Sequence, residues 1–364
     1  MRKLSAGLVA LFLLIQIANS EDVHGCTTAD AKAVFVNGTW VLMREDGTVM
    51  SNESYCHGGE YSNGLIRFDL CHSNLHDYLT PTGERTVRVT AAEASDFGEG
   101  LAAVQDKETG NWGYIDKTGH MVIPPKYEEA GKFSEGLAPV SIADVRQYID
   151  SEGKVVLTPH RDGWTVFAAY PFNSGAALIM FFDRATGAYE KTLIDRSGKW
   201  LITPTERLTG ELNNGLAPLW DASVQKMGFI NSSGKFVIPP QFIGSAELPF
   251  EEGLAAVWLG RQPNIKVGFI DKQGGWAIPA TYEDAYHFCG GLAPAKLNGL
   301  WGFIDSKGGF AIQPKFPRAE SFEDGIAEVY AADENGKFHR ELINRKGTVL
   351  FHETTESVFV TLQD

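Results

Sequence analysis

The chain has 364 residues, of which 43% are hydrophobic and 21% charged, and it contains 39 glycines and 4 cysteines. This ordinary globular composition excludes a globally disordered chain and a collagen-like fibre. The net charge of −14 argues against a nucleic-acid partner or an anionic membrane surface, because phosphate binding depends on Lys and Arg.

The amino terminus has the pattern of a secretory signal. Arg2 and Lys3 precede an apolar run from residue 7 to 18, and small residues close it at Ala18 and Ser20. The run has about half of the roughly 20 residues that span a bilayer, so a membrane anchor is the lesser alternative. We predict a signal peptide at 1–20, export, and no membrane insertion after cleavage. Cleavage removes two basic and no acidic residues, which lowers the net charge from −14 to −16.

A short phrase recurs along the rest of the chain, and it centres on a glycine. Typical copies are Phe97-Gly-Glu-Gly-Leu-Ala102 and Phe250-Glu-Glu-Gly-Leu-Ala255. The shared glycines are Gly64, Gly100, Gly136, Gly175, Gly215, Gly253, Gly291 and Gly325. They are 34 to 40 residues apart, a period that indicates a repeat architecture.

Two further phrases follow in register within each unit. The first is represented by Trp112-Gly-Tyr-Ile-Asp116 and the second by Val122-Ile-Pro-Pro125. Residues 33–50 match 293–310 and read as a first unit without its opening phrase. We therefore predict about nine units over residues 31–350, within a single array that forms the mature chain, 21–364.

Each unit is predicted to be a β-meander. The stretch after the glycine is strand one, and the alternating Trp-Gly-Phe-Ile-Asp type of phrase is strand two. Asp-x-x-Gly then forms a tight turn, and strand three ends at its proline because proline cannot donate to the ladder. Segments such as 127–130 suggest a short fourth strand. No segment keeps a period of 3.6, so the fold class is all-β.

Neighbouring units must cover one another, because three or four short strands cannot bury their own face. We expect propeller-like closure, which hides sheet edges, in preference to an open β-repeat superhelix, which needs polar caps.

The pattern resembles the WG-repeat family of β-repeat proteins, whose unit carries a tryptophan-glycine pair before an aromatic-Ile-Asp strand. The pair is complete at Trp112-Gly113 and Trp301-Gly302, and Met227-Gly228 and Val267-Gly268 keep the glycine. The units around Tyr148, Leu193 and Leu342 have lost both. The resemblance implies an all-β repeat protein, often exported and bacterial, with no established catalytic residues.

The recurring carboxylates are interpreted as turn residues. The Asp of the second phrase is replaced by Asn231 and Asn344, and an amide can cap a turn but cannot act as a general acid. The Glu of the first phrase, as in Glu99, is also replaced elsewhere and is interpreted as a solvated turn residue. The repeated aromatic residues are expected in the core, with sugar stacking as the alternative. Trp220 and Trp258 stand where other units have polar residues and are candidates for ligand contact.

The cysteines are expected to form disulfides, because an exported protein meets oxidising conditions. The segment from Cys56-His57 to Cys71-His72 and His76 also carries zinc-ligand residue types, so a metal is the alternative there. We predict the pair Cys56–Cys71, with Cys26–Cys289 as a possible second pair, and expect no metal and no cofactor.

No motif of a known catalytic mechanism is present. We predict an exported, periplasmic or extracellular, non-catalytic protein that presents a binding surface through loops of variable length. Its partner would be a protein or a glycan that the sequence does not identify. The alternative is a glycan-active hydrolase with carboxylates in a central cleft, for which Asp183, Asp221 and Glu247 are candidates.

Overall fold

The computed structural model describes residue 29 and residues 31–51, 53–245, 250–261, 263–333 and 336–353. Within these ranges the secondary structure consists of strands, bridges and turns, which confirms the all-β fold class. None of the described segments is a helix that could cross a membrane. The predicted signal peptide, 1–20, lies outside the described residues.

The described strands form eight antiparallel sheets, and the first of these sheets contains two of the predicted units. The strands of the first four units are β1 (Ala31–Val36) and β2 (Thr39–Arg44); β3 (Tyr55–Ser62), β4 (Leu65–Leu70), β5 (Leu75–Leu79) and β6 (Arg85–Thr90); β7 (Leu101–Gln105), β8 (Trp112–Asp116) and β9 (Met121–Tyr127); and β10 (Glu129–Ala130), β11 (Ala138–Ile142), β12 (Val145–Ile149) and β13 (Val155–Leu157).

The remaining five units follow in the same order. Their strands are β14 (Thr165–Ala169), β15 (Ala177–Phe182) and β16 (Tyr189–Ile194); β17 (Leu216–Asp221), β18 (Lys226–Asn231) and β19 (Phe236–Phe242); β20 (Gly244–Ser245), β21 (Leu254–Leu259), β22 (Lys266–Asp271) and β23 (Trp276–Tyr282); β24 (Asp284–Ala285), β25 (Ala293–Leu297), β26 (Leu300–Ile304) and β27 (Phe310–Phe316); and β28 (Arg318–Ala319), β29 (Ile326–Ala332), β30 (Phe338–Asn344) and β31 (Val349–His352). The two-residue strands are the short strands predicted as fourth strands, but each pairs with strand one of the following unit and so begins the next sheet.

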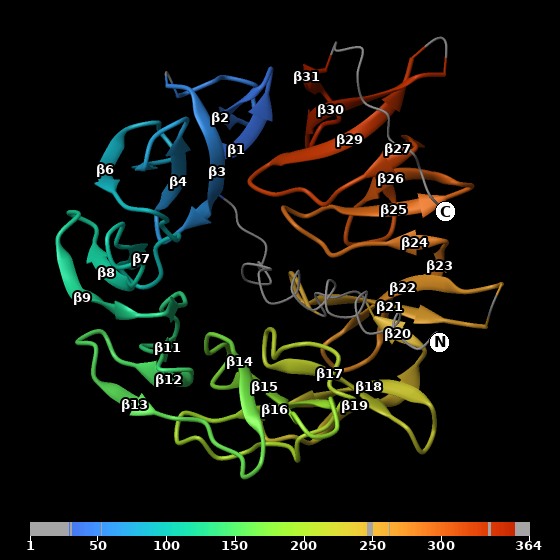
Figure 1. Ribbon diagram of the computed structural model, residues 1–364. Coiled ribbons are helices and arrows are strands. Elements are labelled where there is room, and N and C mark those ends of the chain that lie inside the picture. Colours follow the sequence, from blue (N-terminus) through green and yellow to red (C-terminus); the bar gives the residue numbers. More distant parts are fainter. Residues whose placement is uncertain are drawn as a thin grey trace, which may run out of the picture.

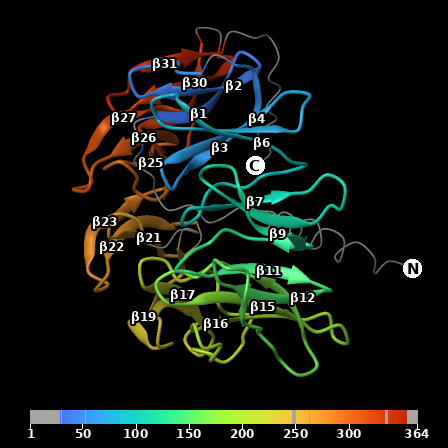
Figure 2. The ribbon, with the colours of Figure 1, turned by 90° about the vertical axis from the view of Figure 1, so that its left-hand side faces the viewer.

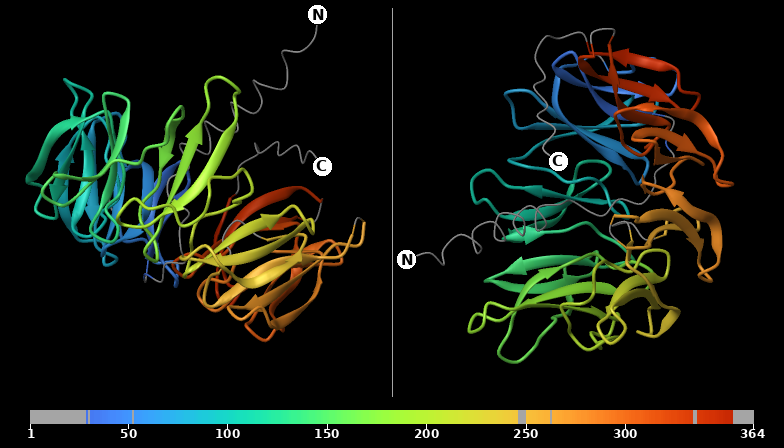
Figure 3. Two further views of the ribbon diagram at one scale, coloured as in Figure 1. Left: turned by 90° about the horizontal axis from the view of Figure 1, so that it is seen from below. Right: turned by 90° about the vertical axis from the view of Figure 1, so that its right-hand side faces the viewer.

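The units follow one another in a circular order (Figure 1), so that the first unit, in blue, lies beside the last, in red. The same neighbours lie together in the two side views (Figures 2 and 3). Side chains confirm the contact, because Val34 and Met43 of the first unit form one buried cluster with Ile326 and Leu342 of the last.

The repeated glycine phrase forms a two-residue hairpin turn. In the copy at 98–101, Gly98 and Leu101 exchange both backbone hydrogen bonds, and Glu99 and Gly100 have φ of 49° and 90°. Two successive positive φ angles are the requirement of a type I′ turn, which glycine meets without strain. The turn sets the direction of strand one and places the preceding Phe97 in the core, where it is 1% exposed.

Each of these phenylalanines packs against an aromatic residue of strand two in the preceding unit. Phe133, for example, lies 4.9 Å from Tyr114 between ring centroids in an edge-to-face arrangement. The equivalent pairs, with centroids 4.7 to 5.2 Å apart, are Tyr78–Phe97, Tyr148–Phe172, Phe229–Phe250, Phe269–Phe288 and Phe303–Phe322. These rings are fully buried, so they form the core between units.

The glycine of the tryptophan-glycine pair is required by a bulge in strand three. Trp112 pairs with Tyr127 and Tyr114 with Ile123, so two extra residues of β9 bulge opposite Gly113. A Cβ on Gly113 would lie 2.5 Å from the Ile123 carbonyl oxygen and 2.8 Å from the Pro125 nitrogen. Gly228 and Gly268 have the same close approach, which explains why these two units keep the glycine although they have lost the tryptophan.

The prediction that proline ends strand three is wrong. Strand β9 continues through Pro124 and Pro125 to Tyr127, and β19, β23 and β27 continue past their prolines in the same way. The prolines lie in the bulge, where the ladder needs no backbone N–H, so they interrupt no hydrogen bond. In the unit of Tyr148, which lacks the glycine, β13 is shortened to three residues.

The Asp-x-x-Gly turns have the predicted geometry. The Oδ1 atom of Asp116 accepts hydrogen bonds from the backbone N–H groups of Thr118 and His120, at 2.8 and 3.1 Å. Asn231 accepts the same two bonds from Ser233 and Lys235, at 3.0 and 3.2 Å. A side-chain oxygen therefore caps the turn, and the negative charge of aspartate is not required.

The first-phrase glutamate is an exposed turn residue, as predicted, and it also connects consecutive units. The Glu99 carboxylate accepts the backbone N–H of Gly136 at 2.7 Å, and Glu135 accepts that of Gly175 at 3.0 Å. Other side chains at this position make the same kind of bond, namely Asn63 to Gly100, Ser174 to Gly215 and Glu252 to Gly291. We call this series of bonds the turn-to-turn relay.

Truncating one inter-unit aromatic residue should destabilise the array strongly. Phe133→Ala removes a ring that is 2% exposed, and we expect a loss of about 3–5 kcal/mol in the free energy of unfolding, measured by urea denaturation. Val122→Ala is the control, since Val122 is 44% exposed and its loss should change stability by no more than about 0.5 kcal/mol. Equal effects of the two variants would contradict this account of the core.

The relay predicts different outcomes for two substitutions at Glu135. Glu135→Ala removes the acceptor for the Gly175 N–H and should cost about 1 kcal/mol of stability. Glu135→Gln keeps an acceptor oxygen and should retain most of that stability, as Asn63 does naturally. Urea denaturation of both variants measures the difference. A Gln variant as unstable as the Ala variant would show that charge, rather than the hydrogen bond, is responsible.

Candidate functional site

The first and last units meet at a seam that differs from the other unit boundaries. Strand β1 and its partner β2 pack against β29, β30 and β31, and side chains cross the boundary at several points. Arg345 forms an ion pair with Glu45, with Nη2 2.6 Å from Oε2, and it lowers the pKa of Glu45. Arg340 donates to the Phe35 carbonyl oxygen at 2.8 Å.

The turn-to-turn relay continues across this seam. Asp324 stands in the last unit where Glu99 stands in an earlier one, and its Oδ1 atom accepts the backbone N–H of Ala29 at 2.6 Å. The last unit therefore binds the first with the same kind of bond that joins consecutive units.

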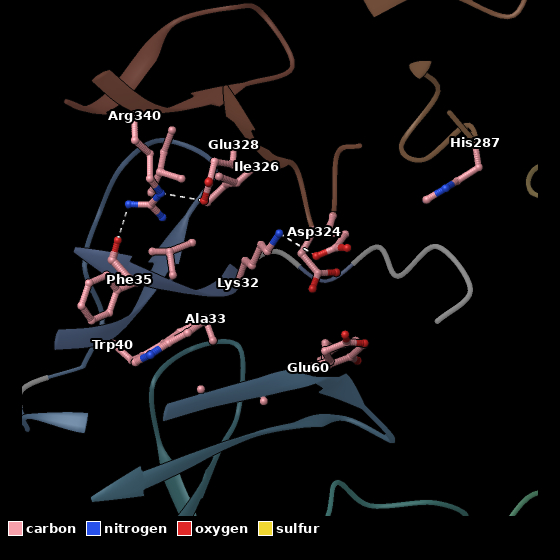
Figure 4. Close-up of a pocket in the computed structure, with 16 residues that line it drawn as sticks. Lys32, Ala33, Phe35, Trp40, Glu60, His287, Asp324, Ile326, Glu328 and Arg340 are labelled. Atoms are coloured by element: carbon pink, nitrogen blue, oxygen red, sulfur yellow. Dashed lines mark hydrogen bonds and ion pairs between the residues drawn. The ribbon is translucent and has the colours of Figure 1, made fainter. Parts of the chain in front are cut away.

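A cavity of about 240 Å³ lies at the seam (Figure 4). We call it the seam pocket. Its aromatic side is formed by Phe35 and Trp40, whose rings are 6.0 Å apart between centroids, together with Tyr61. Trp40 lies against Gly58, where an added Cβ would come within 2.8 Å of the indole ring. The polar lining residues are Lys32, Glu60, His287, Glu323, Asp324, Glu328 and Arg340.

The lining of the seam pocket has more negative than positive charge. Four carboxylates face two permanent cations, and both cations are paired within the pocket. Lys32 lies 2.6 Å from Glu323, and Arg340 lies 2.6 Å from Glu328. Burial lowers the pKa of His287, against the opposing charges of nearby glutamates, so His287 adds little positive charge at neutral pH.

A second polar group lies within the unit formed by β3 to β6. The buried Arg67 donates to both oxygens of Asp69 at 2.8 and 2.9 Å, and His76 Nδ1 lies 2.6 Å from Asp69 Oδ1. The Nε2 atom of His76 is buried and has no hydrogen-bond partner among the described residues. Burial favours a higher pKa for Asp69, but hydrogen bonds from His57 and His76 and the charge of Arg67 outweigh it and hold the pKa well below its usual range.

A neighbouring polar network, formed by Tyr55, Asp77 and Arg88, connects β3 and β5 to the edge strand β6 of the same sheet. Asp77 is fully buried, accepts the Tyr55 hydroxyl at 3.1 Å and pairs with Arg88 at 2.5 Å. Burial and the Asp77 carboxylate raise the pKa of Tyr55. These residues satisfy one another's hydrogen bonds, which is the arrangement of a structural network inside a sheet.

The predicted disulfide between Cys56 and Cys71 is confirmed, with Cα atoms 4.9 Å apart. It links β3 to the turn after β4, so the zinc alternative loses two of its ligands. Cys289 is also disulfide-bonded. Cys26 lies outside the described residues, so the pair Cys26–Cys289 stays a prediction.

The two tryptophans predicted as ligand contacts are half-buried. Trp220 packs against the cluster that contains Met227 and Phe250, and Trp258 packs against the next cluster and covers Gly244. The structure places them on adjacent units and away from the seam pocket. Their role in binding stays a prediction.

The carboxylates considered for hydrolysis do not form a pair. Asp183 and Asp221 belong to different sheets, and each caps its own turn. Hydrogen bonds from Thr186 and Ser223, respectively, lower their pKa, whereas a general acid needs a raised one. Glu247 lies outside the described residues.

Sequence reasoning did not find the seam pocket, because its residues come from the two ends of the chain. In the sequence, the first unit lacks the opening phrase that the other units have. This gap could have indicated that the last unit completes the first and that the pocket lies between them.

Four segments match the family model of the WG containing repeat, at residues 112–144, 227–257, 268–301 and 301–337. No curated protein shows significant sequence similarity to the chain. Among solved structures, a eukaryotic initiation factor is similar at 11% identity and a TM-score of 0.61, covering 90% of this chain and 96% of that one. This likeness concerns the fold alone.

Two other solved structures have lower similarity. A protein of unknown function from Bacteroides caccae has 14% identity and a TM-score of 0.29, over 57% of this chain and 92% of that one. Hsv2 from Kluyveromyces lactis has 8% identity and a TM-score of 0.30, over 77% of this chain and 94% of that one.

The low pKa of Asp69 predicts a pH-dependent contribution to stability. A carboxylate whose pKa falls on folding stabilises above its ordinary pKa, about 3.9, and that stability is lost as the pH falls toward the folded pKa. Asp69→Asn should therefore cost about 3 kcal/mol at pH 7, since it removes the carboxylate that pairs with the buried Arg67 at 2.8 Å, and less at pH 3. Urea denaturation at both pH values measures this, with Glu108→Gln as an exposed control. A cost that stays constant with pH would contradict the assignment.

Proposed function

Because the chain is a WG-repeat protein, we propose that it is an exported, non-catalytic binding protein whose seam pocket accepts a basic side chain of a protein partner. The observation that carries the proposal is the pocket at the seam, where aromatic rings and an excess of carboxylates face one cavity.

The proposal includes closure of the array into a propeller-like ring. The relay bond from Ala29 to Asp324 and the shared cluster around Val34 and Leu342 support closure, because in an open array this cluster would be exposed. The likeness to the initiation factor over 90% of the chain supports the same type of fold.

Charge complementarity favours a cationic ligand. The pocket lining has four carboxylates against two permanent cations, and the whole chain has a net charge of −14. A cavity lined by one sign of charge raises the local concentration of the opposite charge and selects against ligands of like charge. Acidic peptides and phosphorylated ligands are disfavoured for the same reason.

The aromatic side of the pocket fits the same ligand. A Lys or Arg head group over the ring of Trp40 or Phe35 would gain a cation–π interaction, while Glu60 would accept its hydrogen bonds. A volume of about 240 Å³ suits one long side chain better than a complete small-molecule cofactor.

The variable loops provide the surface around which a larger partner would lie. Strands β25 and β26 are joined by the two-residue turn Asn298-Gly299, whereas six residues, 183–188, separate β15 from β16. A rigid scaffold with loops of different length is how repeat folds form recognition surfaces. The Cys56–Cys71 disulfide supports export, because disulfides persist outside the reducing cytosol.

A titration of the mature protein with short peptides tests the proposal. Isothermal calorimetry at low salt should show saturable binding of oligolysine and none of oligoglutamate. Glu60→Gln removes one pocket carboxylate and should weaken oligolysine binding about tenfold, a difference of about 1.4 kcal/mol. Added salt should weaken binding to the wild-type protein.

The matched control is Glu108→Gln, which removes the same charge from an exposed loop between β7 and β8. It should bind oligolysine as the wild-type protein does. Equal weakening in both variants would show a non-specific effect of net charge and contradict the pocket. Binding of a neutral oligosaccharide in place of oligolysine, with loss in Glu60→Gln, would assign the pocket to a glycan instead.

A further inference from the structure

A group of metal-ligand side chains lies on the last hairpin, apart from the seam pocket. His339 and Glu341 are two residues apart on β30, so their side chains share one face of the strand, and His352 of β31 is the register partner of Glu341. The three ligand atoms all lie within 4.8 Å of one another. Two strands of one rigid sheet therefore fix the positions of all three side chains.

The distances fit one metal coordination shell. Glu341 Oε1 lies 3.1 Å from His339 Nε2 and 3.2 Å from His352 Nδ1, and the two imidazole centroids are 4.2 Å apart. In tetrahedral zinc sites with bonds of about 2.0–2.1 Å, neighbouring ligand atoms are about 3.3 Å apart. The three side chains thus need only small shifts to contact one ion.

The surroundings favour a cation at this position. Arg340 lies on the opposite face of β30, where it pairs with Glu328, so this arginine does not neutralise Glu341. The side chains of His339 and Glu341 are 17% and 13% exposed, whereas His352 is 47% exposed. The two inner ligands are therefore held in place, and the outer one leaves a path for an ion and a water molecule.

Ordinary hydrogen bonds between Glu341 and the two histidines are the simpler explanation of these contacts. They do not account for the convergence of all three side chains on one point. One carboxylate oxygen approaches one nitrogen of each histidine, and the two rings lie close together. Two imidazoles and one carboxylate that converge in this way are a typical ligand set for zinc, with water in the fourth position.

We propose that His339 Nε2, Glu341 and His352 Nδ1 bind one Zn²⁺ ion. From the sequence we expect no metal and do not consider these histidines, which lie 13 residues apart in the chain. The ion would attach the edge strand β31 to β30 and so stabilise the unit that meets β1 and β2 at the seam. The proposal is independent of the function proposed for the seam pocket.

Metal binding by the untagged mature protein tests this site. After treatment with a chelator, titration with Zn²⁺ should show one equivalent bound and a higher thermal midpoint. Co²⁺ should give the visible absorption of a four-coordinate ion. His352→Ala and Glu341→Gln should each weaken Zn²⁺ binding at least tenfold and abolish the shift in midpoint.

Two matched variants make the outcome decisive. His160→Ala removes an exposed histidine elsewhere and should bind Zn²⁺ normally. His57→Ala removes a histidine beside Asp69 and should also bind normally. Unchanged Zn²⁺ affinity in His352→Ala, or loss of binding in His57→Ala with retention in His352→Ala, would overturn the proposal. His352 is substantially exposed, so its variant should fold even if one at His339 does not.

Discussion

Every sheet of this protein is apolar on both faces, so none is stable without a neighbour on each side. Ile115 packs into the cluster with Tyr78 of the preceding unit, whereas the adjacent Tyr114 packs against Phe133 of the next. Residues next to each other on a strand point to opposite faces, so one strand serves two cores. A terminal unit of such an array has one uncovered face, and contact between the first and last units covers both.

The seam follows from this requirement, and the candidate binding site follows from the seam. The first unit supplies β1 and β2 and lacks the opening phrase in its sequence, and the last supplies a four-stranded sheet. Asp324, at the relay position of the last unit, accepts the backbone N–H of Ala29 and so joins the two units. The seam nevertheless differs from the boundaries between consecutive units. It contains the seam pocket, whose walls are aromatic and charged.

The turn carboxylates show how one position can be structural without being invariant. Asp116 and Asn231 make the same backbone bonds, and Glu99 and Ser174 both accept a glycine N–H of the next unit. An oxygen acceptor at the right place is the common requirement, and a negative charge is not part of it.

The sequence alone determined the all-β class, the period, the turns and the disulfide between Cys56 and Cys71. Each of these depends on residues close together in the chain: a glycine with positive φ, an alternation of side chains, or two cysteines 15 residues apart. It did not show that Gly113 faces a bulge or that the prolines continue the strand, because both depend on how strand three approaches strand two.

Only the tertiary structure decided which residues meet across the seam and on the last hairpin. Lys32 meets Glu323 because the array returns to its start, and His352 meets Glu341 because β31 pairs with β30 in one register. Register and the contact between the first and last units are set by the sum of many contacts between distant segments. No local pattern encodes that sum, which is why the repeats could be predicted and the candidate sites could not.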